Sequence, residues 1–153
     1  MELDFSINDD QLRSVFTNFE RPTRPLMTAI ANFLADEARN AIKTQTSPDG
    51  SKFAALNPKY AARKAKDKNT RRNGILQQSG GLYDSIAAEA TNDTAIVKTN
   101  RPVSGGYDLG AIHQFKSFGG KEPRRFFPIT DQGDLLPDAV EEIQGLIADY
   151  FSL

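Results

Sequence analysis

His113, the only histidine in the chain, is the side chain best suited to acid–base or metal chemistry, but it lacks suitable neighbours in the sequence. A metal site would need carboxylate ligands, and no Asp or Glu stands near His113 at helical or strand spacing. A hydrolytic triad would need a nucleophile on a recognisable turn, and the chain holds no G-x-S-x-G sequence. The absence of cysteine excludes thiol catalysis, disulfides and cysteine-ligated zinc. We therefore expect a packed structural histidine, and no catalytic, cofactor-binding or metal-binding residue.

Three glycine pairs, Gly80–Gly81, Gly105–Gly106 and Gly119–Gly120, are the next candidates for chemistry. None matches the spacing of a P-loop or of a dinucleotide-binding turn, so we expect them to form turns and loop hinges. The carboxylate pair Glu141–Glu142 is expected on the exposed face of a helix, which disfavours acid–base catalysis. The chain is therefore predicted not to be an enzyme and to need no cofactor.

The strongest chemical signal is a cationic segment, residues 47–74, in which Asp67 alone opposes the positive charges from Lys52 onwards. Because the segment is poor in apolar residues, it cannot bury enough surface to order itself, and we expect an extended basic arm or loop. Three interpretations remain open: a solvated flexible loop, an arm that contacts another protein, and a nucleic-acid-binding segment over residues 52–72 that includes Tyr60. The cations are Lys52, Lys59, Arg63, Lys64, Lys66, Lys68, Arg71 and Arg72.

The C-terminal end of the chain is acidic, so the formal net charge of −1 conceals two separated poles. No Lys or Arg follows Arg125, and we expect the acidic residues beyond it to be unopposed. Separated poles fit contact between copies of one protein, or with a charged partner, better than a general nucleic-acid binder. The acidic residues are Asp131, Asp134, Asp138, Glu141, Glu142 and Asp149.

Length and composition predict one soluble domain over residues 1–153, since the chain is 39% hydrophobic and 25% charged. No basic and apolar leader is recognisable at the N-terminus, and no run approaches the roughly 20 apolar residues that span a bilayer. We therefore expect no membrane association. The lack of cysteine fits synthesis in a reducing cytoplasm.

Helices are expected to frame the domain, because apolar residues recur at three- and four-residue spacing near both ends. A long N-terminal helix is predicted over residues 24–43, with Thr23 as its cap. A C-terminal amphipathic helix is predicted over residues 136–150, with Asp134 as its N-cap. A weaker helix is predicted over residues 9–19.

The middle of the chain has the composition of β structure. Residues 85–90 and 95–98 are predicted strands, joined by the hairpin turn Thr91–Asp93. Residues 124–129 are a further predicted strand, and residues 109–115 are compatible with a strand or one helical turn. Together these elements predict an α+β fold: a small antiparallel sheet packed against the N-terminal and C-terminal helices, with an extended basic loop.

Four motifs occur in a characteristic order. They are P-x-G-x-x-F-A-x-L at 48–56, I-L-x-x-S-G-x-L-x-x-S-I at 75–86, a segment of the A-x-I-H-Q-F type, here G-A-I-H-Q-F, at 110–115, and P-R-x-F-x-x-I at 123–129. In this order and spacing, over roughly residues 20–152, the chain resembles the phage virion morphogenesis family, which includes tail-completion and head–tail joining proteins of the phage Mu type.

The resemblance implies a structural virion protein of a tailed phage, without enzyme activity, assembled in the host bacterial cytoplasm. It implies a homo-oligomeric ring, with a hexamer expected, at the neck or tail end, in contact with connector, tail-terminator or tail-tube proteins. We expect the basic arm to reach a neighbouring subunit or adjoining ring; a contact with DNA in the lumen is the other possibility. The candidate assembly contacts are Lys59, Arg63, Lys64, Lys66, Lys68, Arg71, Arg72, Phe118, Arg124, Arg125, Asp138, Glu141 and Glu142.

Overall fold

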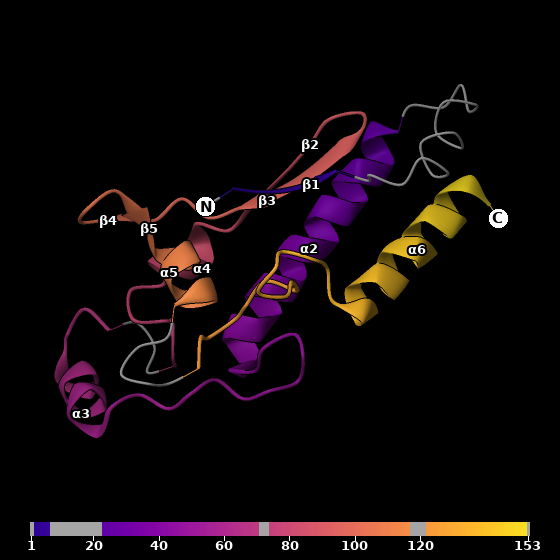
Figure 1. Ribbon diagram of the computed structural model, residues 1–153. Helices are drawn as coiled ribbons and strands as arrows, with labels where there is room; N and C mark the ends of the chain where they lie inside the picture. The colour runs from indigo at the N-terminus through magenta and orange to yellow at the C-terminus, as the bar shows by residue number, and fades with distance from the viewer. Residues whose placement is uncertain (1, 7–22, 71–73, 117–121, 153) are drawn as a thin grey trace.

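A computed structural model describes residues 2–6, 23–70, 74–116 and 122–152, and in this part of the chain the fold is α+β (Figure 1). The predicted helix over 9–19 lies outside the described residues, as do the candidate contacts Arg71, Arg72 and Phe118. The elements, in chain order, are β1 (Glu2–Ser6), α2 (Arg24–Thr44), α3 (Pro58–Lys66), α4 (Gly81–Asp84), β2 (Ala87–Ala90), β3 (Thr94–Lys98), β4 (Pro102–Val103), β5 (Tyr107–Asp108), α5 (Leu109–Phe115) and α6 (Pro137–Phe151).

The long helix α2 is the centre of the fold, with a sheet on one side and α6 on the other (Figure 1). The sheet is antiparallel, in the order β1-β3-β2, and the register places Ala90 opposite Ala95. The predicted hairpin is confirmed: the N–H of Thr91 donates to the carbonyl of Thr94 across the turn. A second, two-stranded ladder joins β4 and β5.

Helix α2 confirms the prediction for residues 24–43, and its buried face is wide because it packs against two neighbours. Alanines on this face let the sheet and α6 approach the helix backbone closely. Thr23 occupies the N-cap position, but its hydroxyl donates to the carbonyl of Asn92 instead of capping the helix. The buried residues of α2 are Leu26, Met27, Ile30, Ala31, Leu34, Ala35, Ala38, Ala41 and Ile42.

Helix α6 confirms the predicted C-terminal helix, although it starts one residue later and is not capped by Asp134. The N-cap residue is Leu136, because Asp134 is held in a turn in which its carbonyl accepts from the N–H of Thr130. The helix packs on α2 through Ala139, Ile143, Ile147 and Phe151, which are buried.

The predicted strand over residues 124–129 is wrong. The segment is irregular, with one isolated bridge from Ile129 to Leu135, and its side chains Phe126 and Phe127 are fully buried. The buried side chain of Gln114 takes the role of a strand partner, since its Oε1 accepts from both phenylalanine N–H groups at 3.0 Å. Backbone groups of a buried segment need such partners, and one amide side chain provides two of them here.

Residues 109–115, left open between strand and helix, form α5. Asp108 caps this helix, accepting from the N–H of Gly110 at 2.8 Å and from the hydroxyl of Thr99 at 2.5 Å. Gly110 is required by this packing, because a Cβ there would lie 2.3 Å from the Thr99 hydroxyl oxygen.

The basic segment 47–74 leaves the end of α2 through a turn at Ser47–Gly50 and returns at Gly74. Among the described residues of this segment, helix α3 is capped by the side chain of Asn57 and stands at the edge of the molecule, away from the three-stranded sheet and from α6 (Figure 1). Among the described residues, no helix is both long and apolar enough to cross a membrane.

Candidate assembly surfaces

Helix α3 presents a cationic surface. Lys59, Arg63 and Lys66 are exposed on the helix, and Lys68 is exposed just beyond it. The guanidinium of Arg63 lies over the ring of Tyr60, 5.3 Å from its centroid. Among the described residues none of these four cations forms an ion pair with a carboxylate, so their charge faces solvent and is available to a partner.

Lys64 does not belong to this surface, although it lies in the same helix. Its side chain is buried, and Nζ donates to the carbonyl of Gly74 at 2.6 Å, while the hydroxyl of Thr70 donates to the Lys64 carbonyl. Burial lowers the pKa of the Lys64 ammonium, and the positive charge of Arg124 lowers it further. Lys64 therefore connects α3 to Thr70 and to Gly74 at the end of the basic segment. Its replacement is expected to disturb the structure of the segment itself.

The arm is tied to the body by hydrogen bonds that sequence patterns did not reveal. Gln45, in the left-handed conformation at the end of α2, donates from Nε2 to the carbonyl of Ile75 at 3.0 Å and accepts from the Ile75 N–H. Gln77 donates to the carbonyl of Ile42 at 2.6 Å, and Arg124 donates to the carbonyl of Ala54 at 2.9 Å. The arm therefore has a defined attachment at both its beginning and its end.

A cleft of about 660 Å³ lies between α3 and the body of the protein, next to α4 and α5. Its apolar wall includes Leu56, Leu76 and Leu109. Lys64, Arg101 and Arg124 also line it, and no Asp or Glu is among the described lining residues. The cleft thus combines apolar surface with three cationic side chains and no described lining carboxylate.

His113 lies on the cleft wall, in α5. Its pKa is lowered to about 4, first by burial and second by the charge of Arg124, so the imidazole is neutral at pH 7. No group of three or more His, Cys, Asp or Glu side chains suited to a metal ion occurs in the described ranges. His113 therefore contributes a neutral, half-buried imidazole to the cleft wall.

Helix α6 carries the acidic surface. Asp138, Glu141 and Glu142 are all exposed, and the first and last of them border a recess of about 380 Å³ with Glu37 of α2. Burial raises the pKa of Glu37, and the negative charges of Glu142 and Asp36 raise it further. Glu37 was not anticipated from the sequence, because it belongs to a helix distant in the chain.

The expectation that every acid beyond residue 130 is unopposed is wrong for Asp131. Its carboxylate is paired with Arg125 in a two-pronged contact, with Nε–Oδ1 2.8 Å and Nη2–Oδ2 3.0 Å. Both groups therefore already have a partner within the chain, and so does the predicted contact Arg124, through Ala54 and Ala55.

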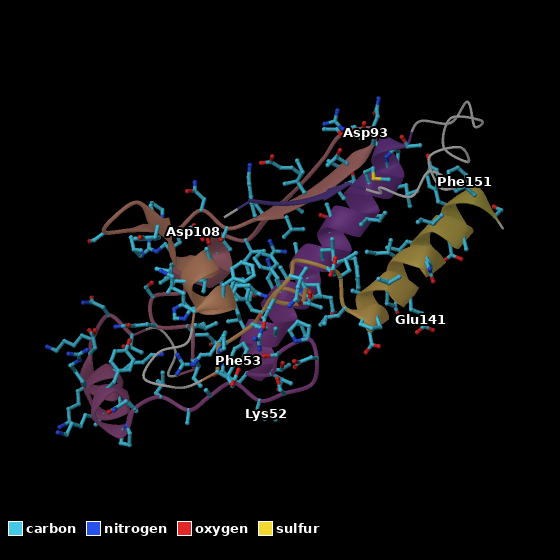
Figure 2. The ribbon with its side chains drawn as sticks, viewed as in Figure 1. Lys52, Phe53, Asp93, Asp108, Glu141 and Phe151 are labelled. Atoms are coloured by element: carbon cyan, nitrogen blue, oxygen red, sulfur yellow. The ribbon has the colours of Figure 1, made fainter. Side chains whose placement is uncertain are left out.

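The two charged surfaces lie at different ends of the molecule. Helix α3 is at one side of the fold and α6 is at the other, with α2 between them (Figure 1), and Glu141 marks the acidic side in Figure 2. The cationic and acidic candidates are therefore not brought together within one chain. They can meet only between chains.

Comparison with known proteins gives one positive result. The model of the phage virion morphogenesis family matches residues 4–151, nearly the whole chain, and the chain therefore belongs to that family. No curated protein and no solved structure matches the chain significantly.

Proposed function

We propose that this member of the phage virion morphogenesis family is a structural protein of a tailed phage that acts in tail completion or head–tail joining. Family membership supports a role in building the virion. The observation that carries the finer proposal is the separation of a cationic helix, α3, from an acidic helix, α6, on opposite sides of one small fold; the exposed cations of α3 form no ion pair within the described residues.

Such a subunit is suited to a ring at the neck or tail end. A ring requires a heterologous interface, in which one surface of a subunit meets a different surface of the next and the rotation closes. Opposite charges on the two surfaces set register and select the partner, while desolvated apolar side chains supply most of the affinity. Six copies are the expected number.

The same surfaces define the expected partners. The ring would lie in the virion against connector, tail-terminator or tail-tube proteins, after assembly in the host cytoplasm. This structural role requires no catalytic step, and the family is described as one of virion morphogenesis.

Neutralising the exposed cations of α3 tests the proposal. The variant Lys59→Gln/Arg63→Gln/Lys66→Gln keeps good helix formers and spares buried Lys64. A matched control removes three exposed cations elsewhere: Arg24→Gln/Lys43→Gln/Lys116→Gln. In phage lacking the wild-type gene, we expect the α3 variant to lower the yield of complete particles well below the control. Equal yields would refute the role of α3 in assembly.

Nucleic-acid binding by residues 52–72 is the second candidate function, favoured by the exposed cations of α3 beside Tyr60. If the arm binds DNA, the affinity should fall steeply as the salt concentration rises. A plot of the logarithm of the binding constant against the logarithm of the salt concentration should have a slope of about −0.9 for each phosphate neutralised. Charge exchange separates the two functions. The variant Lys59→Glu/Arg63→Glu should fail to assemble under either function. Adding Glu141→Lys/Glu142→Lys should restore assembly if α3 of one subunit contacts α6 of the next, and should have no such effect if the arm binds DNA.

A further inference from the structure

We propose that the cleft between α3 and α5 is the receptor for helix α6 of a neighbouring copy, which inserts Glu141 toward the cleft cations and Val140 against the apolar wall. This inference rests on the proposed ring and identifies the contact within it. It extends the interface from the exposed cations of α3 to the cleft beside that helix.

The cleft is built to receive a negative charge. Lys64 and Arg124 point their charged groups at carbonyl oxygens, those of Gly74 and Ala54, and not at carboxylates. Carbonyls satisfy their hydrogen bonds but leave the full positive charge in place. Lys64 is buried and Arg124 is half-buried, so each charged group is already partly removed from water, and this burial lowers the pKa of both.

Arg101 adds a third cation to the cleft lining. Its guanidinium lies against Gly81, where a Cβ would be 2.8 Å from Nε, so the glycine makes room for it. The backbone N–H of Arg101 is held by the carboxylate of Asp108, which also caps α5. The carboxylate of Asp108 is thus engaged with backbone N–H groups and with the Thr99 hydroxyl, and Asp108 is not among the described lining residues of the cleft.

The apolar half of the cleft restricts the occupant. Leu56, Leu76 and Leu109 would be poor partners for a phosphate backbone but good partners for an aliphatic side chain. An occupant must therefore carry a carboxylate beside an apolar residue. This favours a protein segment over nucleic acid.

Helix α6 offers that combination on its free side. Val140 is among the exposed large hydrophobic residues, with 37% of its surface accessible, and Glu141 follows it directly on an exposed helix face. The opposite face of α6 stays packed on its own α2 through Ile143 and Ile147. A neighbour can therefore receive the outer side of α6 without unpacking it.

Disulfide trapping tests this contact directly, because the chain contains no cysteine. One protein carries Ser79→Cys at the cleft rim, and a second, size-tagged protein carries Gln144→Cys, one turn beyond Val140 on α6. The control pairs Gln144→Cys with Asn92→Cys in the β2–β3 turn. Mixed, oxidised full-length proteins should give the tagged heterodimer at least about tenfold faster for Ser79 than for Asn92, a ratio worth about 1.4 kcal/mol.

Charge variants then test the chemistry of the contact. Glu141→Lys should reduce the trapping rate to that of the control, and adding Arg101→Glu to the Ser79→Cys partner should restore it. Circular dichroism of each variant is the control for a retained fold, and only variants with the wild-type spectrum are compared. Equal rates for Ser79 and Asn92, or trapping that ignores Glu141, would overturn the inference.

The two proposals fail separately. If the chain is incorporated into particles but Ser79 is not trapped by Gln144, the virion role stands and the cleft contact is refuted. If Ser79 in particles is trapped instead by a different virion protein, the occupant proposed here is wrong. Absence of the chain from particles would refute the virion role itself.

Discussion

Replacing Gln114 with Met tests whether one buried amide side chain does the work of a strand partner for residues 126 and 127. Oε1 of Gln114 accepts from the N–H groups of Phe126 and Phe127 at 3.0 Å each, and the side chain has no exposed surface. Met has nearly the same length and volume, but its thioether is a weak acceptor. The substitution therefore fills the space and leaves two buried donors without a good partner.

The expected cost follows from those two donors. Each unsatisfied buried N–H costs about 1–3 kcal/mol, giving a range of about 2–6 kcal/mol. The third bond, from Nε2 to the Phe127 carbonyl, is 3.4 Å long and contributes little. Removing a polar group from the core offsets part of the cost. We expect a loss of about 3 kcal/mol in the free energy of unfolding, or about 6–12 °C in Tm for a domain of this size.

Urea unfolding followed by far-UV circular dichroism measures this loss. The midpoint should fall while the slope m stays constant, since the surface exposed on unfolding is unchanged. The matched control is Gln144→Met, the same chemical change at an exposed position of α6. A difference between the two variants below about 1 kcal/mol would refute the reasoning that Gln114 holds the 124–129 segment.

Two further predictions concern single residues of the described fold. Gly110→Ala should destabilise the protein by about 1–3 kcal/mol, because the new Cβ would meet Thr99. Gly145→Ala should stabilise it by up to about 1 kcal/mol, because alanine is the better helix former and nothing lies within 4 Å of a Cβ at that position in α6. Equal melting temperatures for the two variants would contradict this. The lowered pKa of His113, about 4 in the folded protein against 6.5 unfolded, means that the unfolded chain binds a proton first. Stability should therefore be full above pH 6.5 and fall by up to about 3 kcal/mol as the pH drops to 4, and His113→Gln should flatten this part of the profile relative to the wild type.

Several elements could be predicted from the sequence because their signals are local. The spacing of apolar residues indicated α2 and α6, and the Thr91–Asp93 turn indicated the β2–β3 hairpin. The buried segment around Phe126 could not be predicted in the same way. Its apolar run resembles a strand, but the partner that satisfies its backbone is the side chain of Gln114, which lies in a helix.

The charged candidates show the same limit. All the cations of residues 52–72 look equivalent in the sequence, yet the structure buries Lys64 against Gly74 and leaves Lys59, Arg63 and Lys66 exposed. Asp131 looks like its acidic neighbours until Arg125 is found beside it. Whether a charge is free depends on partners that the chain brings together only when it folds.

The sequence by itself determined the family, the α+β class and the presence of a basic segment and a separate acidic C-terminal segment, because these depend on composition, order and periodicity along the chain. The tertiary structure alone decided which charges remain available, and it placed Lys64, Arg101 and Arg124 around one apolar cleft. The physical reason is that burial and hydrogen-bond partnership are non-local. Residues from α3, from the β3–β4 connection and from the 124–129 segment are far apart in the sequence and line one cleft only in the folded chain, where Lys64 is bonded to Gly74 and Arg124 to Ala54.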